Sequence, residues 1–431
     1  MARPAKPRRV TEPTSPLQIS DFRLYWLSRF AASFATTGMI VVLGYQLYDV
    51  ARSDYAMSIA VAAFQLGIFG LVQFVPMLLL TPVSGLVADR FERRTVAACA
   101  IGIDLVIAAA LALATYVDAI TLPLLFVLGA LHGSARVFMA PALSSIPPNV
   151  VPASVLPRAI AMSSLSWQMA SIIGPVAAGF LFAMNPAAPY ALAVGLLLAS
   201  IALLLAIRPV HPPAGNRDTH PLRQIAEGFR YVRTNHFLLG CVTLDLFAVL
   251  LGGATALLPV FARDILHVGP VGLGQMRAAT AIGAVAVGLW LSVKPITHNV
   301  GIKMLGGVAI YGAATLAFGL SRWMPLSLAM LALLGAGDMV SVFIRNSLVL
   351  LNTPDAVRGR VQAISSLAIS ASNELGEMQS GLAAALLGAT GAVVFGGAGA
   401  IIVTIVWAIV FPELARTRTF AAQYQQTEPV K

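Results

Sequence analysis

Residues 152–180 read PASVLPRAIAMSSLSWQMASIIGPVAAGF, and residues 354–382 read PDAVRGRVQAISSLAISASNELGEMQSGL. The second stretch aligns with the first without a gap when the chain is shifted by 202 positions. A direct repeat of this kind predicts two halves of similar structure and like orientation. The identities fall at Pro152/Pro354, Val155/Val357, Arg158/Arg360, Ala161/Ala363, Ser163/Ser365, Ser164/Ser366, Leu165/Leu367, Gly174/Gly376 and Gly179/Gly381.

The composition of the chain is that of a membrane protein. Of the 431 residues, 58% are hydrophobic and 11% are charged, which is too few charges to cover the surface of a soluble domain. A helix crosses a hydrocarbon core of about 30 Å with about 20 apolar residues. We therefore expect an all-α membrane protein with twelve transmembrane helices in two pseudo-symmetric six-helix bundles. The twelve apolar runs lie at 22–49, 56–84, 95–117, 120–147, 156–184, 189–208, 236–262, 270–293, 300–320, 324–350, 360–388 and 390–411.

The positive charges behind the net charge of +10 lie mainly in the loops and tails expected on the cytoplasmic side. This distribution reflects membrane topology and does not indicate a nucleic-acid partner. With the N-terminus inside, 21 of the 28 lysines and arginines fall in cytoplasmic segments, which is the positive-inside pattern. We therefore expect both termini in the cytoplasm and a location in the bacterial inner membrane. The two cysteines, Cys99 and Cys241, lie inside predicted helices and are interpreted as small buried apolar residues without a redox role.

The longest polar gap divides the chain near its middle. Its second part, from Leu222 to Val232, alternates basic and apolar residues and predicts an amphipathic helix on the cytoplasmic surface. The polar, Pro- and Arg-rich start of the chain predicts a cytosolic tail and not a cleaved signal peptide. The predicted parts are a tail over 1–21, a bundle over 22–208, a linker over 209–235, a second bundle over 236–411 and a tail over 412–431.

Between the second and third apolar runs stands GLVADRFERR, residues 85–94. It resembles the G-x-L-A-D-R-x-G-R-R/K signature of the major facilitator superfamily, from which it departs at Val87 and Glu92. The resemblance implies that Asp89 caps the start of the opposing helix near Arg360, and that arginines complete a cytoplasmic gate. The gating residues implied are Gly85, Asp89, Arg90, Arg93, Arg94, Arg358 and Arg360.

The segment GPVAAG, residues 174–179, resembles the antiporter signature G-x-x-x-G-P-x-x-G-G through Gly174, Pro175 and Gly179. It departs from that signature at Ala170 and Ala178. A proline kink with close packing of helices would need the same small residues. The match favours export and antiport.

Several longer stretches resemble the enterobactin-exporter-like group of drug:proton antiporters, over about residues 17–411. This resemblance implies a secondary active transporter that exports an amphipathic drug or siderophore by alternating access. The first, fourth, seventh and tenth apolar runs would line its cavity. The stretches are ALLPVFARDIL (256–266), GLGQMRAATAIGA (272–284), TPDAVRGRVQAISSLAIS (353–370) and NELGEMQSG (373–381).

Ionisable residues inside membrane helices are rare, and each is a functional hypothesis. Arg136 and Asp338 are equivalent under the 202-residue shift, so we expect them to face each other as a substrate site, a proton site or a structural ion pair. The proton-coupling candidates are Glu374, Glu377, Asp338, Asp245 and Arg136. The nine intramembrane charges are Arg29, Asp104, Arg136, Asp245, Arg277, Asp338, Arg345, Glu374 and Glu377.

Glu374 and Glu377 form a polar stripe with Ser370 and Asn373 on an otherwise apolar helix. Glu374 aligns with Ile172 of the first half, so the fold itself does not require a carboxylate there. Two adjacent carboxylates seldom both ionise, and a site that holds or sheds a proton suits a proton-coupled carrier. The two glutamates are therefore either the proton site, with Glu377 the more important, or half of a gate that pairs with arginine.

The remaining expectations concern the substrate and the alternatives. The chain carries no metal-ligand cluster and no nucleotide-binding Gly-rich loop followed by Lys-Ser/Thr, so we expect no cofactor and a proton gradient as the driving force. We expect a monomer in the lipid bilayer that binds a small molecule and no nucleic acid. An uptake carrier or lysolipid translocator of the same fold is the alternative, and a membrane enzyme or a sensor is disfavoured because no complete catalytic constellation is present. The expected cavity residues are Phe34, Met39, Arg136, Trp167, Phe247, Asp338 and Arg345, although the aromatic and Met residues could equally pack between helices.

Overall fold

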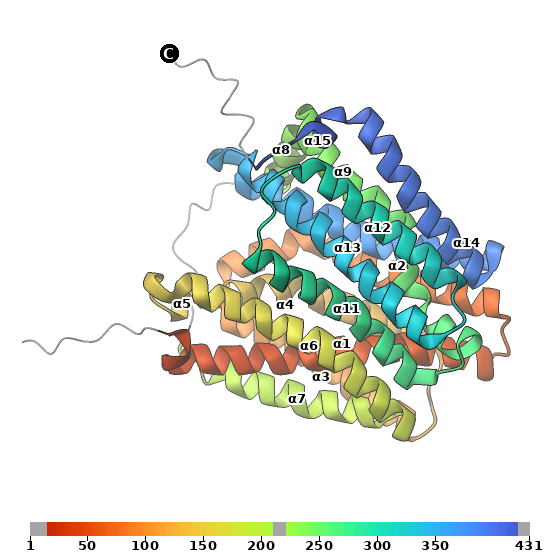
Figure 1. Cartoon of the computed structure of the whole chain (residues 1–431). Coiled ribbons are helices and arrows are strands. Elements are labelled where there is room, and N and C mark those ends of the chain that lie inside the picture. Colours follow the sequence, from red (N-terminus) through yellow and green to blue (C-terminus); the bar gives the residue numbers. More distant parts are fainter. Residues whose placement is uncertain (1–14, 210–220, 421–431) are drawn as a thin grey trace, which may run out of the picture.

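The computed structural model of the chain describes residues 15–209 and 221–420; the side chains of Asp89 and a few other residues inside these ranges are not described. Within these ranges the chain is helical, without strands (Figure 1). The long helices of the first half are α1 (Ser20–Ser53), α2 (Ile59–Arg90), α3 (Arg93–Tyr116), α4 (Leu122–Ser144), α6 (Leu156–Met184) and α7 (Ala188–Leu205). Those of the second half are α9 (His236–Leu251), α11 (Gly269–Val293), α12 (Val300–Leu320), α13 (Met324–Leu351) and α14 (Asp355–Val410).

The length of α14 resolves the number of membrane crossings. Eleven helical segments of the described chain are long and apolar enough to cross a membrane, and one of them, Val357–Val410, has 54 residues. At 1.5 Å per residue this segment is about 80 Å long, more than twice a bilayer core. Its backbone leaves the helical conformation at Gly388, where φ is 75°, a value that glycine adopts without steric cost. The segment therefore makes two crossings, and the prediction of twelve is confirmed, with a sharp turn in place of a separate loop.

The predicted run 236–262 is interrupted, contrary to the sequence pattern. Helix α9 ends at Leu251, and short turns η3 (Ala254–Leu257), α10 (Leu258–Val260) and η4 (Phe261–Ile265) follow it. The Tyr311 hydroxyl donates to the Gly252 carbonyl at 2.7 Å, and a Cβ on Gly253 would lie 2.6 Å from the Gly376 carbonyl. The helix breaks where its backbone passes closest to α12 and α14.

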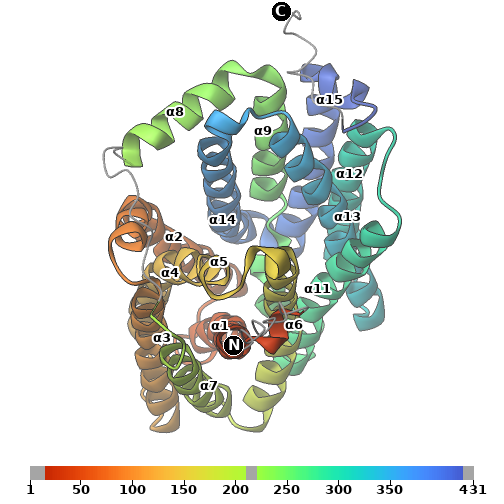
Figure 2. The ribbon, with the colours of Figure 1, turned by 90° about the vertical axis from the view of Figure 1, so that its left-hand side faces the viewer.

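The two halves meet along two helix pairs, α2 with α14 and α6 with α11 (Figure 2). One of the repeated glycine pairs, Gly179/Gly381, lies at these contacts. A Cβ on Gly381 would lie 2.6 Å from Gly67 Cα, and one on Gly179 would lie 3.4 Å from Gly274 Cα. Close approach of helix backbones through small residues is the usual way in which membrane helices associate. The identity Gly179/Gly381 therefore marks equivalent contacts between the halves.

Both ends of the helical domain lie at one end of the bundle, here called the terminal end, together with α8 (Pro221–Thr234) and α15 (Pro412–Arg416) (Figure 2). Helix α8 covers the predicted amphipathic segment. It packs on the start of α14, where Arg360 forms an ion pair with Glu227 at 2.9 Å. The opposite end of the bundle is called the far end.

Candidate functional site

Three adjoining chambers form the interior cavity: two lie between the two halves, and the third is lined by residues of the first half. The polar chamber, of about 200 Å³, contains the charged side chains of α4, α11 and α14. The large chamber, of about 630 Å³, is mainly apolar, and the side chamber, of about 320 Å³, lies against α1 and α4. Ile40 lines all three, so the chambers are continuous around the middle of α1.

An ion pair crosses the polar chamber from one half to the other. Arg136 Nη1 on α4 lies 3.3 Å from Glu374 Oε1 on α14, with the Arg136 side chain 42% exposed and that of Glu374 8%. The expected pairing of Arg136 with Asp338 is wrong for this conformation. Asp338 lines the large chamber, whereas α14 packs on α2 beside α4 and brings Glu374 to Arg136.

Glu377 lies one turn further along α14 and also lines the polar chamber. A Cβ on Gly70 of α2 would lie 2.9 Å from Glu377 Oε2, so glycine at this position makes room for the carboxylate. Arg136 and Arg277 both interact electrostatically with Glu377. The chamber thus contains two carboxylates and two guanidinium groups, which balance when both glutamates are ionised. Protonation of either glutamate would remove one negative charge. The neighbouring guanidinium group would then lack part of its counter-charge.

Two polar residues near this cluster were missing from the expected site. Gln73 lines the polar chamber and its buried Oε1 has no hydrogen-bond partner in the described part of the chain. His132, one turn before Arg136 on α4, lies 2.8 Å from Asp104 through Nδ1, and both side chains are buried. The only signal in the sequence was the position of His132 inside an apolar run, away from the loops where most histidines lie.

Asp245 and Arg345 form a buried ion pair inside the second half, with side-chain exposures of 8% and 4%. Neither lines any of the three chambers. The interpretation of Asp245 as a proton-coupling residue and of Arg345 as a cavity residue is therefore not supported by this arrangement. The two residues neutralise each other within the packing of α9 and α13.

Removing one partner of this pair is expected to destabilise the protein. Asp245→Asn leaves the Arg345 charge buried without a counter-charge, which lowers the free energy of unfolding by about 3–5 kcal/mol. The double variant Asp245→Asn, Arg345→Met removes both charges and should recover much of the loss. Thermal unfolding in detergent measures this, with Arg230→Gln on the exposed face of α8 as the control. A double variant that melts no higher than the worse single variant would contradict the structural role of the pair.

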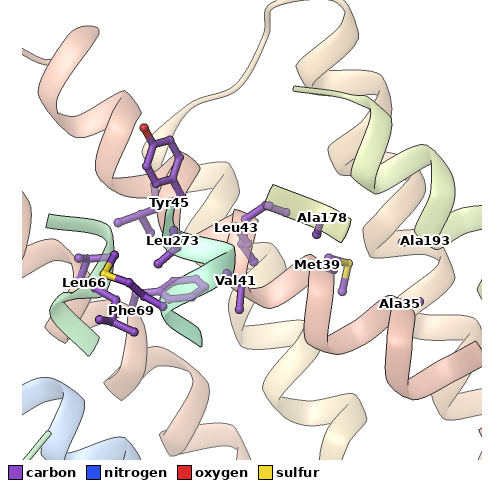
Figure 3. Packing of buried hydrophobic residues seen from close by; sticks show 14 of the residues in the cluster. Ala35, Met39, Val41, Leu43, Tyr45, Leu66, Phe69, Ala178, Ala193 and Leu273 are labelled. Carbon is purple, nitrogen blue, oxygen red and sulfur yellow. The ribbon is translucent and has the colours of Figure 1, made fainter. Parts of the chain in front are cut away.

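The expected cavity residues divide into two groups. Trp167 lines the large and side chambers. Arg136 lines the polar and side chambers, and Asp338 lines the large chamber. Met39 is 1% exposed and packs among Ala35, Ala178 and other core residues (Figure 3). Phe34 borders a narrow gap between α1, α6 and α7 together with Met39, and Phe247 packs against Trp407 with ring centroids 5.3 Å apart. None of these three lines the chambers. On α1, Ile40 and Val41 face the cavity in place of Phe34 and Met39.

A group of polar contacts joins the two halves at the far end and is called the far-end latch. Arg263 lies 3.1 Å from Asp49, and Arg52 lies 3.4 Å from Asp264. The Tyr48 hydroxyl donates to Asp264 at 2.6 Å. The latch joins α1 to η4, and nothing in the sequence pattern pointed to it as a unit.

The gating residues implied by the loop motif lie at the terminal end. The Asp89 side chain lies outside the described part of the structure, so its capping role stays a prediction, as does the contribution of Gly85. Arg90 is exposed. Arg93 donates to the Ser145 carbonyl at 3.0 Å, Arg94 pairs with Glu92 at 3.0 Å, and Arg358 donates to the Thr353 carbonyl at 3.3 Å. Each of these three contacts lies within one half of the molecule.

The antiporter-like segment serves close packing. A Cβ on Gly174 would lie 2.8 Å from the Phe34 carbonyl of α1, and one on Gly274 of α11 would lie 2.6 Å from the Pro175 carbonyl. Together with Gly179, these residues place α6 between α1 and α11. Under the 202-residue shift Glu377 takes the place of Pro175, so the two halves use the same position for different purposes.

Comparison with known proteins agrees with this architecture. A family model described as "Transmembrane secretion effector" matches residues 11–429. The chain is 28% identical over 409 residues to the enterobactin exporter EntS of Escherichia coli O127:H6, covering 92% of this chain and 93% of the relative, and equally identical to EntS of Citrobacter koseri.

Solved transporter structures share the fold. A POT family transporter in complex with 5-aminolevulinic acid superposes with a TM-score of 0.73 at 13% identity, over 92% of this chain and 97% of that one. A bacterial homologue of the lysosomal transporter Spinster, in an inward-facing and unoccupied conformation, gives a TM-score of 0.66 at 14% identity, over 92% and 95% of the two chains.

Proposed function

Because the chain belongs to the transmembrane secretion effector family, within the major facilitator superfamily, we propose that it exports an amphipathic small molecule of the siderophore or drug type by alternating access, in exchange for protons. It is a multi-pass membrane transport protein and not an enzyme. The direction and the substrate type are suggested by the enterobactin exporters that it resembles over most of its length. The observation that carries the proposal is the Arg136–Glu374 ion pair, which joins the two halves in the chamber that Glu377 also lines.

The proposed cycle follows from the position of the charges. The distribution of lysine and arginine favours a cytoplasmic position for the terminal end. In the proposed cycle the far-end latch closes the external side, and the cavity receives substrate from inside. A proton on Glu374 would remove its attraction for Arg136 and loosen one contact between the halves. Protonation and release would thereby be linked to the side on which the cavity opens.

Everted membrane vesicles test this function directly. Vesicles whose interior is acidified should accumulate an exported siderophore when they contain the protein, and collapse of the pH gradient with nigericin should abolish the accumulation. Vesicles from a strain without the protein are the control. Accumulation that is insensitive to nigericin would reject the proposed exchange for protons. Uptake of the same compound by intact cells would identify an importer.

A further inference from the structure

Arg29 is a positively charged residue that lines the cavity, and the ion pairs of the site give it no function. It lines both the large and the side chamber and lies within α1, nine residues after the helix begins. Among the described residues no carboxylate forms an ion pair with it, and its buried Nε has no hydrogen-bond partner. A guanidinium group inside a membrane domain normally has a counter-charge. No described residue of the chain supplies one, so a bound anion is a candidate for the counter-charge.

The guanidinium group of Arg29 is held in position by neutral groups. Arg29 Nη1 donates to the Tyr25 hydroxyl at 3.1 Å, and the Ser163 hydroxyl donates to the same oxygen at 3.1 Å. Tyr25 is fully buried. The two hydroxyls orient the guanidinium group without neutralising it, which is the arrangement expected of a site prepared for an anion.

The large chamber combines this cation with a second one and with apolar surface. Arg277 on α11 lines the same chamber, and its Nε is also without a partner in the described chain. Trp167 lines the chamber as well, and its side chain is 52% exposed. Apolar residues of α1 and α11 surround these groups.

We propose that the large chamber binds an anionic amphiphile, whose charged oxygen atoms contact Arg29 and Arg277 and whose flat apolar part packs on Trp167. The inference rests on the proposed export function and specifies the charge of its substrate. Arg29 belongs to the first half and Arg277 to the second, so a single anion between them would draw the halves together. Among the described residues that line this chamber, Asp338 is the carboxylate, and a cationic substrate would bind beside it instead.

Three probes of one shape and different charge test the proposal: naphthalene-2-carboxylate, naphthalene-2-carboxamide and 2-naphthylmethylammonium. Binding to the purified full-length protein is measured by calorimetry in detergent, without any gradient. The carboxylate should bind about tenfold or more tightly than the amide, because hydrogen bonds to a charged group are stronger than those between neutral groups. Arg29→Gln should remove this preference and leave amide binding unchanged, Arg29→Lys should keep part of it, and Arg230→Gln should behave as wild type.

The outcomes separate this inference from the proposed function. The anion site would be overturned if the three probes bound equally or if the ammonium compound bound most tightly. It would also be overturned if Arg29→Gln unfolded at the wild-type temperature and still preferred the carboxylate. If the protein bound the carboxylate selectively but transported none of the compounds, the anion site would stand and the proposed export function would be rejected. Loss of nigericin-sensitive accumulation with an intact preference would reject only proton exchange.

Discussion

The double variant Glu374→Gln, Glu377→Gln is expected to lose transport driven by a pH gradient while it still exchanges substrate between equal pools. Glutamine keeps the size of glutamate and can still accept a hydrogen bond from Arg136, but it cannot bind or release a proton. Net transport against a proton flow therefore stops, with a decrease of about 100-fold or more that corresponds to the loss of an essential proton carrier. Exchange of labelled for unlabelled substrate needs no net proton movement.

Purified protein in liposomes separates the possible outcomes. A pH step measures driven transport, and preloaded vesicles at equal pH measure exchange. Glu413→Gln makes the same chemical change at an exposed residue after α14 and should leave both activities intact. If the glutamates form only a gate, the double variant should lose exchange as well. Full driven transport by the double variant would end the coupling hypothesis for both residues.

Breaking the far-end latch should shift the carrier towards the conformation that is open at that end. Asp49→Asn together with Asp264→Asn removes both carboxylates and leaves Arg52 and Arg263 without counter-charges. The two partly exposed ion pairs contribute about 1 kcal/mol each, and the Tyr48 hydrogen bond weakens by about 1 kcal/mol when its acceptor changes from a carboxylate to a neutral amide. The population of the outward-open conformation should therefore rise by about 30- to 150-fold.

A cysteine in the polar chamber reports this shift. Gly44 lines that chamber, and a Cβ added there meets no atom within 4 Å, so Gly44→Cys is tolerated in a background in which Cys99 and Cys241 are replaced by alanine. Labelling of intact cells with a membrane-impermeant thiol reagent should be faster in the latch variant. Asp54→Asn, an exposed carboxylate after α1, is the matched control. Unchanged labelling of the latch variant would show that these pairs do not hold the far end closed.

The sequence by itself determined the number of crossings and the division into two halves. Lipid offers no hydrogen bonds to the backbone, so every apolar run long enough to cross had to be a helix. The repeat aligns Gly179 with Gly381, and the structure has both at contacts between the halves. The gap between the runs 360–388 and 390–411 marked the turn at Gly388. These features depend on composition along the chain, which the sequence states directly.

Only the tertiary structure decided which charges meet and which residues line the cavity. Arg136 pairs with Glu374 and not with its repeat equivalent Asp338, and Asp245 pairs with Arg345 away from the cavity. Successive residues of a helix point about 100° apart, so the rotation of α1 about its own axis decides that Ile40 and not Met39 faces the cavity. An ion pair forms only within about 4 Å, and the separation of two side chains on different helices depends on how the two halves pack together. The repeat fixes the equivalence of positions, whereas the partner of each charge follows from that packing.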